Sequence, residues 1–213
     1  EIDGVVVDDL SAPANTWLPR DGMRATLFFP PPAPPLASPK PALEIPPEGP
    51  YAELVKRVKM SIEDICTKED LPWSSKSLRP QDIEAFATLA KERGPLNVVN
   101  IYAYDNWIDD DALEILCPCF KLMPNLASLY LHNNEITSRG CEAIANHPPV
   151  GKLNNLSLWR NQIDGKGFDA LGAAIRTGTL QLSMLVIHYN KASIPAKDRL
   201  TDDCDGKGVV LSM

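Results

Sequence analysis

Residues 126–144 read LASLYLHNNEITSRGCEAI, and this pattern sets out a complete structural unit. Leu129 and Leu131 are two residues apart, which places both on one side of a short β-strand. Gly140 comes where a helix must start close to the strand layer, so that a small residue fits there. Ile144 then faces inward from that helix. The stretch therefore predicts one unit of strand, turn and helix.

The pattern recurs along the chain at nearly constant spacing. Residues 153–171, LNNLSLWRNQIDGKGFDAL, repeat it 27 residues further on with every key position kept in character. A copy 28 residues earlier starts at Val98 and has Ala103 at one leucine position, while a copy 29 residues later fades after Asn190. Half a unit precedes the first copy. No unit of this kind closes its own core, so the units must stack.

The spacing L-x-x-L-x-L-x-x-N-x-I-x-x-x-G-x-x-x-[IL] in residues 126–144 and 153–171 resembles the leucine-rich repeat family, in particular its ribonuclease-inhibitor-like class. The resemblance implies an α/β fold, a short leucine-rich repeat solenoid with parallel strands on the concave side, helices on the convex side and ligands on the concave face. We expect parallel strands near residues 98–103, 126–131, 156–158 and 185–187.

Three regions are predicted: an extended Pro-rich arm over residues 1–50, a helical N-terminal cap over 51–95, and a leucine-rich repeat domain with a C-terminal strand over 96–213. Ten of the 20 prolines lie between residues 30 and 50, which favours extended polyproline II. The apolar spacing of residues 51–67 predicts an amphipathic helix, and a second helix should follow from about residue 80 to 91. Residues 201–206 are expected to form a polar turn before the last strand.

An asparagine recurs where each predicted strand turns away from the sheet. Its side-chain amide can bond backbone groups that the turn leaves unpaired. We therefore expect a structural column of Asn106, Asn134, Asn161 and Asn190.

Aromatic and imidazole side chains fill two columns that the repeat exposes on the strand side: Tyr104, His132, Trp159 and His188 in one, and Tyr102 and Tyr130 in the other. Exposed aromatic patches mark interfaces, so we expect these six residues to bind protein. The alternative is that the rings only stack on one another. In the arm, Trp17, Phe28 and Phe29 are expected to anchor on another subunit.

The composition argues against several classes of function. A net charge of -7 disfavours nucleic acid and anionic membranes as partners. No run of 18 apolar residues is present, so no membrane-spanning helix is expected. The five scattered cysteines lack zinc-site spacing, and residues 201–206 lack the first ligand of a calcium loop. We expect no metal, no cofactor and no enzymatic activity.

These observations favour a non-catalytic scaffold or linker subunit that binds other protein subunits of a large assembly. Two alternatives share the repeat class: a regulator of a small GTPase similar to the Ran GTPase-activating proteins, and a proteinaceous enzyme inhibitor. The cysteines indicate a reducing intracellular compartment. The start at Glu1 indicates either that a targeting peptide has been removed or that the sequence is part of a longer product. Removal of a targeting peptide would fit a chloroplast or mitochondrial protein with peripheral association to a membrane complex, whereas the repeat fits a cytosolic or ciliary protein equally well.

Overall fold

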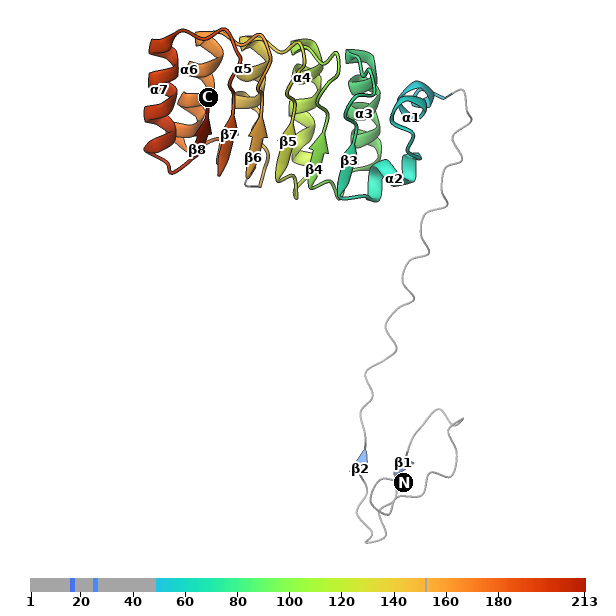
Figure 1. Ribbon diagram of the computed structural model, residues 1–213. Helices are drawn as coiled ribbons and strands as arrows, with labels where there is room; N and C mark the ends of the chain where they lie inside the picture. Colours follow the sequence, from blue (N-terminus) through green and yellow to red (C-terminus); the bar gives the residue numbers. More distant parts are fainter. Residues whose placement is uncertain (1–15, 18–24, 27–48, 152) are drawn as a thin grey trace. The chain divides into compact units, whose positions relative to one another are not determined.

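The computed structural model describes residues 16–17, 25–26, 49–151 and 153–213 (Figure 1). The chain divides into two units, Glu1–Leu43 and Glu44–Met213. In the first unit, β1 (Thr16–Trp17) pairs antiparallel with β2 (Ala25–Thr26), so that Trp17 lies opposite Ala25. Phe28, Phe29 and the proline-rich stretch up to residue 48 lie outside the described residues. The three-region division and the arm stay predictions.

The second unit is built on a parallel sheet of six strands. In sheet order, which is also chain order, these are β3 (Asp70–Pro72), β4 (Asn100–Tyr102), β5 (Ser128–Tyr130), β6 (Asn155–Ser157), β7 (Met184–Val186) and β8 (Val210–Ser212). The central residues of neighbouring strands are in register, for example Ile101 with Leu129 and Leu129 with Leu156. The α/β class and the parallel strands predicted from the sequence are confirmed, although each strand is only three residues long.

A helix follows each strand from β3 to β7, and these helices cover one face of the sheet (Figure 1). They are α3 (Pro80–Arg93), α4 (Asp110–Leu116) with the 3-10 helix η1 (Cys117–Leu122), α5 (Ser138–Asn146), α6 (Gly165–Thr177) and α7 (Ile194–Asp205). Two short helices, α1 (Ala52–Val58) and α2 (Ile62–Thr67), precede β3. Within the described ranges no helix lies on the other face of the sheet, which we call the open face.

The N-terminal region differs from the prediction in two respects. The single helix expected over residues 51–67 is two helices, because Lys59 ends α1 in the left-handed conformation with φ 56° and Ser61 caps the start of α2 through the backbone amide of Asp64. Strand β3 lies between the two predicted helices, where no strand was predicted. Only Leu71 of its three residues is buried, so no alternation was long enough to indicate a strand.

The predicted polar turn at residues 201–206 is also wrong. Residues 201–205 form the end of α7. The cause is an inward stripe of Ala196, Leu200 and Cys204 at helical spacing, which is buried. The acidic residues between them occupy the outer side of the helix.

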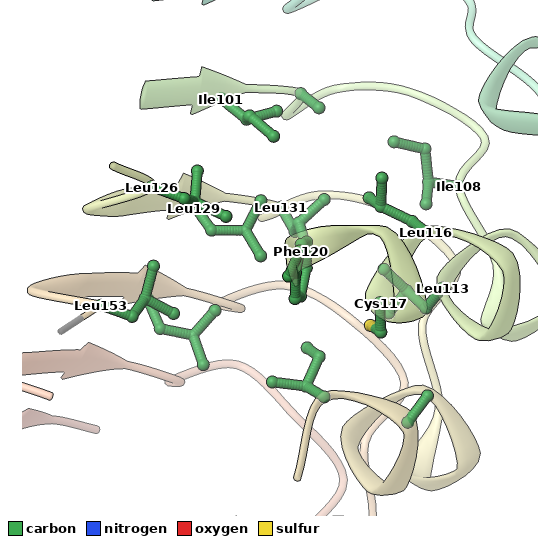
Figure 2. Packing of buried hydrophobic residues seen from close by; sticks show 14 of the residues in the cluster. Ile101, Ile108, Leu113, Leu116, Cys117, Phe120, Leu126, Leu129, Leu131 and Leu153 are labelled. Atoms are coloured by element: carbon green, nitrogen blue, oxygen red, sulfur yellow. The ribbon is translucent and has the colours of Figure 1, made fainter. Parts of the chain in front are cut away.

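The core lies between the sheet and its helices. Strand residues such as Leu129 and helix residues such as Leu113 and Leu116 meet there (Figure 2). Leu129 and Leu156 have no exposed surface. Burying one leucine side chain contributes about 2 kcal/mol, so the stacked units stabilise one another through this layer.

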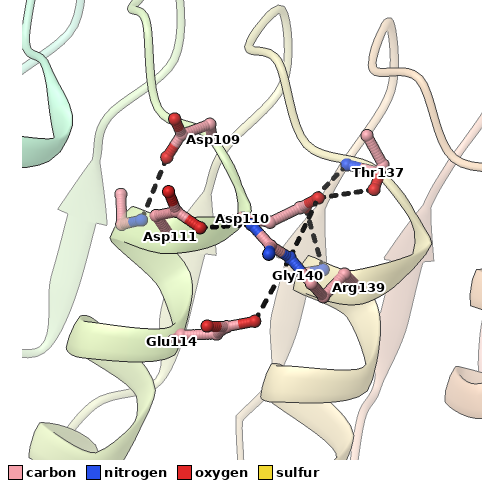
Figure 3. Close-up of polar contacts among 8 residues, drawn as sticks. Asp109, Asp110, Asp111, Glu114, Thr137, Arg139 and Gly140 are labelled. Atoms are coloured by element: carbon pink, nitrogen blue, oxygen red, sulfur yellow. Dashed lines mark hydrogen bonds and ion pairs between the residues drawn. The ribbon is translucent and has the colours of Figure 1, made fainter.

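Acidic residues join the starts of neighbouring helices (Figure 3). Asp109 caps α4 by accepting from the amide of Ala112 at 3.0 Å. The Asp110 carboxylate reaches the next unit, where it accepts from the Thr137 amide at 2.8 Å and the Gly140 amide at 2.9 Å. A β-carbon on Gly140 would lie 2.7 Å from Asp110 Oδ1, so glycine is required for this close approach.

Candidate protein-binding surface

The open face is set by the alternation of side chains along each strand. Leu129 points toward the helices, so its neighbour Tyr130 points to the open face. Tyr102 lies in register with Tyr130, and the two rings stack with their centroids 5.0 Å apart and an interplanar angle of 3°. The second sequence-predicted column thus forms a stacked tyrosine pair on adjacent strands.

The other predicted column forms a longer stack, which we call the ring column: Tyr104, His132, Trp159 and His188. The centroid of His132 lies 4.4 Å from that of Tyr104 and 4.8 Å from that of Trp159. The centroids of Trp159 and His188 are 5.3 Å apart. All four side chains are half-buried. Each ring lies two residues after the last residue of the strand in its own unit.

Stacking determines what the ring column can offer to a ligand. The inner ring faces are occupied by neighbouring rings, so the solvent meets mainly ring edges, which carry the positive part of the aromatic quadrupole. At one end Tyr189 packs edge-on against His188, at 4.9 Å and 76°. The guanidinium of Arg160 lies 5.8 Å from the Trp159 centroid. The rings therefore do stack on one another, as one alternative held, while their outer edges stay accessible.

Burial favours the uncharged form of two of these rings, His132 and Tyr102. Burial lowers the pKa of His132 below its ordinary value of 6.5, although the carboxylate of Asp105 opposes that shift. Its Nδ1 lies 3.2 Å from the hydroxyl of Ser157. Burial and the Asp70 carboxylate raise the pKa of Tyr102. At neutral pH His132 and Tyr102 consequently offer hydrogen-bonding groups without a charge.

The asparagine column lies beneath the turns that follow the strands. Asn134 accepts from the Ile108 amide at 3.0 Å, and its Nδ2 donates to the carbonyls of Ala103 and Leu131, both at 3.0 Å. Equivalent bonds are made by Asn106, Asn161 and Asn190. Each amide therefore bonds its own unit and the unit before it. Asn106, Asn134 and Asn161 are buried.

A further column, between the rings and the asparagines, was not singled out from the sequence: Asp105, Asn133, Arg160 and Tyr189. All four have left-handed backbones, with φ between 51° and 57°. Tyr189 is 76% exposed, and Trp107, two residues after Asp105, is 56% exposed. The signal was present, because the repeat alignment that gives the asparagine column gives this column one residue earlier.

The chain's other reactive groups do not assemble into a site within the described ranges. Cys117, Cys119, Cys141 and Cys204 are buried, and burial raises the pKa of the Cys141 thiol. In the same residues there is no group of three or more His, Cys, Asp or Glu side chains placed to hold a metal ion. None of the helices in that part of the chain is long and apolar enough to span a membrane.

Comparison with known proteins gives a structural likeness only. No protein-family model and no curated protein matches the sequence. Among solved structures, the chain is similar to leiomodin-1 actin-binding site 2, with a TM-score of 0.54 and 15% sequence identity. The match covers 74% of this chain and 88% of the leiomodin chain. At that level of identity the likeness shows a shared fold.

Proposed function

We propose that this chain is a non-catalytic protein-binding subunit, and that the ring column and the stacked tyrosine pair on its open face form the contact surface. The observation that carries the proposal is the ring column itself: four half-buried rings held at centroid spacings of 4.4 to 5.3 Å. A monomer with no partner has little use for such a surface on a face that no helix covers in the described residues.

The physical case rests on preorganisation. Aromatic side chains provide large contact areas and lose little conformational entropy on binding. In this sheet that entropy is already lost, because each inner ring is held between two neighbours. A partner that covers the ring edges would gain the burial of apolar surface without having to order the rings.

We further propose that the repeating units are leucine-rich repeats of the ribonuclease-inhibitor-like class. Support comes from the pairing of repeat and register: residues that correspond at spacings of 28, 27 and 29, such as Ile101, Leu129, Leu156 and Leu185, are strand partners. The repeated bonding of the asparagine column supports the same assignment, because in each unit an asparagine side chain bonds the backbone groups that the turn leaves unpaired.

A scaffold role within a larger assembly is the finer form of this proposal. The leiomodin structure that shares the fold is named as an actin-binding site, which supports a protein as the kind of partner. The proline-rich arm over residues 1–50, with Trp17, Phe28 and Phe29, would give a second point of attachment. A chain with two separate points of attachment can link two neighbours.

The test starts by using the tagged full chain to identify a partner, which is then purified. Trp159→Ala removes the central ring of the column. We expect its affinity for that partner to fall at least fivefold (about 1 kcal/mol), while the chain stays folded and loses about 1–3 kcal/mol of stability from the two stacked pairs. The affinity is measured by titration calorimetry.

Ile194→Ala is the matched control, because Ile194 is 73% exposed on α7, away from the open face. Its affinity should equal that of the wild type. A folded Trp159→Ala chain with unchanged affinity would contradict the proposed contact surface. A chain lacking residues 1–48, tested beside these variants, would report separately on the arm.

A further inference from the structure

A polar groove runs along the edge of the sheet where the strands turn toward the helices. Its first part is a pocket of about 620 Å³, with Asp105, Trp107 and Glu135 among its walls and Asn106 and Asn134 in its lining. Its second part is a pocket of about 560 Å³, lined by Asn133, Trp159, Arg160, Asn161 and Tyr189. Asn133 lines both pockets. The two therefore form one continuous surface that crosses several units.

The lower lining of the groove is already satisfied by the chain itself. The side-chain amides of Asn106, Asn134 and Asn161 already form hydrogen bonds with backbone groups of adjacent units. Recognition must therefore come from the walls. One wall is formed by the column of residues with left-handed backbones, Asp105, Asn133, Arg160 and Tyr189. The other is formed by residues such as Trp107, Glu135 and Gln162.

The walls carry opposite charges at the two ends. Asp105 and Glu135 lie in the first pocket, and Arg160 is the charged residue that lines the second. In the part of the chain that the structure describes, none of these three makes an ion pair. On the helix side, by contrast, Arg139, Arg176 and Arg199 are each paired with carboxylates. Asp105 accepts hydrogen bonds from Asn133 and Ser75, and Arg160 lies over the Trp159 ring. None of these neighbours carries an opposite charge, so the charges of the groove can still form ion pairs with a ligand.

At two wall positions the backbone has a conformation that is unfavourable for the residue type found there. The left-handed conformation costs a side-chain-bearing residue about 1–2 kcal/mol, and Asn and Asp tolerate it best. Asp105 and Asn133 suit it, whereas Arg160 at φ 51° and Tyr189 at φ 53° do not. Retaining Arg and Tyr at such positions points to a use for their side chains. Both line the second pocket.

We propose that this groove binds an extended peptide segment of a protein partner, with a basic side chain over Asp105 and Glu135 and an acidic side chain at Arg160. This inference rests on the protein-binding function proposed above and specifies the chemistry of the segment. From the unit of β3 to that of β7 the groove crosses four strand spacings, roughly 19 Å at about 4.8 Å each, which an extended chain covers with about six residues. Exposed rings, Trp107 and Tyr189, stand toward the two ends and suit apolar flanking residues.

The test uses synthetic eight-residue peptides and the full chain at about 0.15 M salt, where charges on distant surfaces are screened. Two fluorescein-labelled peptides carry lysine near one end and glutamate near the other, in either order. Two others carry lysine at both ends or glutamate at both ends. Fluorescence anisotropy gives each dissociation constant. One of the mixed peptides should bind at least fivefold more tightly than both uniform ones.

Arg160→Glu makes all three charges of the groove negative. The double-lysine peptide should then become the tightest of the four, and the mixed peptide should lose its advantage. Lys166→Glu is the control: it makes the same change of charge on α6 at an exposed position outside both pockets, and should leave the ranking as in the wild type. The anisotropy of all variants is compared after circular dichroism shows equal folding.

The proposal is overturned if the mixed peptides bind no better than the uniform ones, if the double-lysine peptide is already tightest in the wild type, or if Arg160→Glu leaves the ranking unchanged. Failure of the contact surface on the open face would look different. Tyr130 lines neither pocket, so Tyr130→Ala should weaken the binding of a partner that covers the open face and leave the peptide ranking intact.

Discussion

Leu129 and Tyr130 are neighbours in the chain but lie on opposite sides of the sheet. The two sides differ in how fully their apolar side chains are buried and their charges are paired. Leu129 is fully buried against helices of the same chain, and the arginines on the outer surface of those helices are paired with carboxylates of adjacent helices. On the open side, Tyr130 is half-buried against Tyr102, and the charges of the edge groove have no ionic partners in the described residues. The helix side is complete in itself, and the open side is left available.

The largest effect on stability is expected when Leu129 and Tyr130 are replaced by alanine in two separate variants. Leu129→Ala should lower the free energy of unfolding by about 2–5 kcal/mol, because it leaves a cavity between the sheet and the helices. Tyr130→Ala removes one stacked pair and should cost only about 0.5–1.5 kcal/mol. Urea unfolding followed by circular dichroism measures both. Equal losses would mean that the open side is as much a part of the core as the helix side.

An intermediate effect is expected at the boundary between the two sides, where buried Asn134 is preceded by exposed Asn133. Asn134→Ala leaves backbone groups of two units without partners and should cost about 1–3 kcal/mol. Asn133→Gly is the control, since glycine adopts its φ of 55° without strain, and it should be close to neutral. If thermal melts show the same temperature for Asn134→Ala and the wild type, the amides do not hold the units together.

The smallest effect concerns the protonation of the ring column. Burial lowers the pKa of His132 from 6.5, so the unfolded chain binds a proton more readily than the folded chain. Its contribution to stability is therefore fully present above pH 6.5 and is lost as the pH falls from there toward the lowered pKa. The melting temperature should decrease from about pH 7.5 to about pH 5. A slope in His132→Phe as steep as in the wild type would assign the effect to other groups.

The parts of the fold that were predictable are those that recur. Leucines two residues apart and the asparagine that follows them occupy equivalent positions in several units, so their roles could be inferred from spacing alone. Strand β3 could not, because only Leu71 faces the core and its neighbours Asp70 and Pro72 are atypical of strands. The end of α7 was missed because its acidic residues obscured the buried stripe that ends at Cys204.

The candidate surface divides in the same way. The rings of Tyr104 and Trp159 were predictable as a column, but stacking at 4 to 5 Å depends on the side-chain orientation, which the sequence pattern does not specify. The edge groove depends on backbone conformation at Arg160 and Tyr189. Arginine and tyrosine rarely adopt the left-handed conformation, so the residue types at these two positions do not predict it.

The bonds of the asparagine column also have a direction. Asn134 reaches the carbonyl of Ala103 and the amide of Ile108, both in the preceding unit, and Asn190 does the same toward Leu158 and Ile163. Each unit thus carries the means of its own attachment to the one before it. Loss of a whole unit from the C-terminal end therefore leaves every remaining asparagine of the column with its partners, whereas removal of the first unit would take away the Leu78 amide and the Trp73 carbonyl that Asn106 bonds. Change in the length of the array during evolution, or by design, should therefore be easier at one end than at the other.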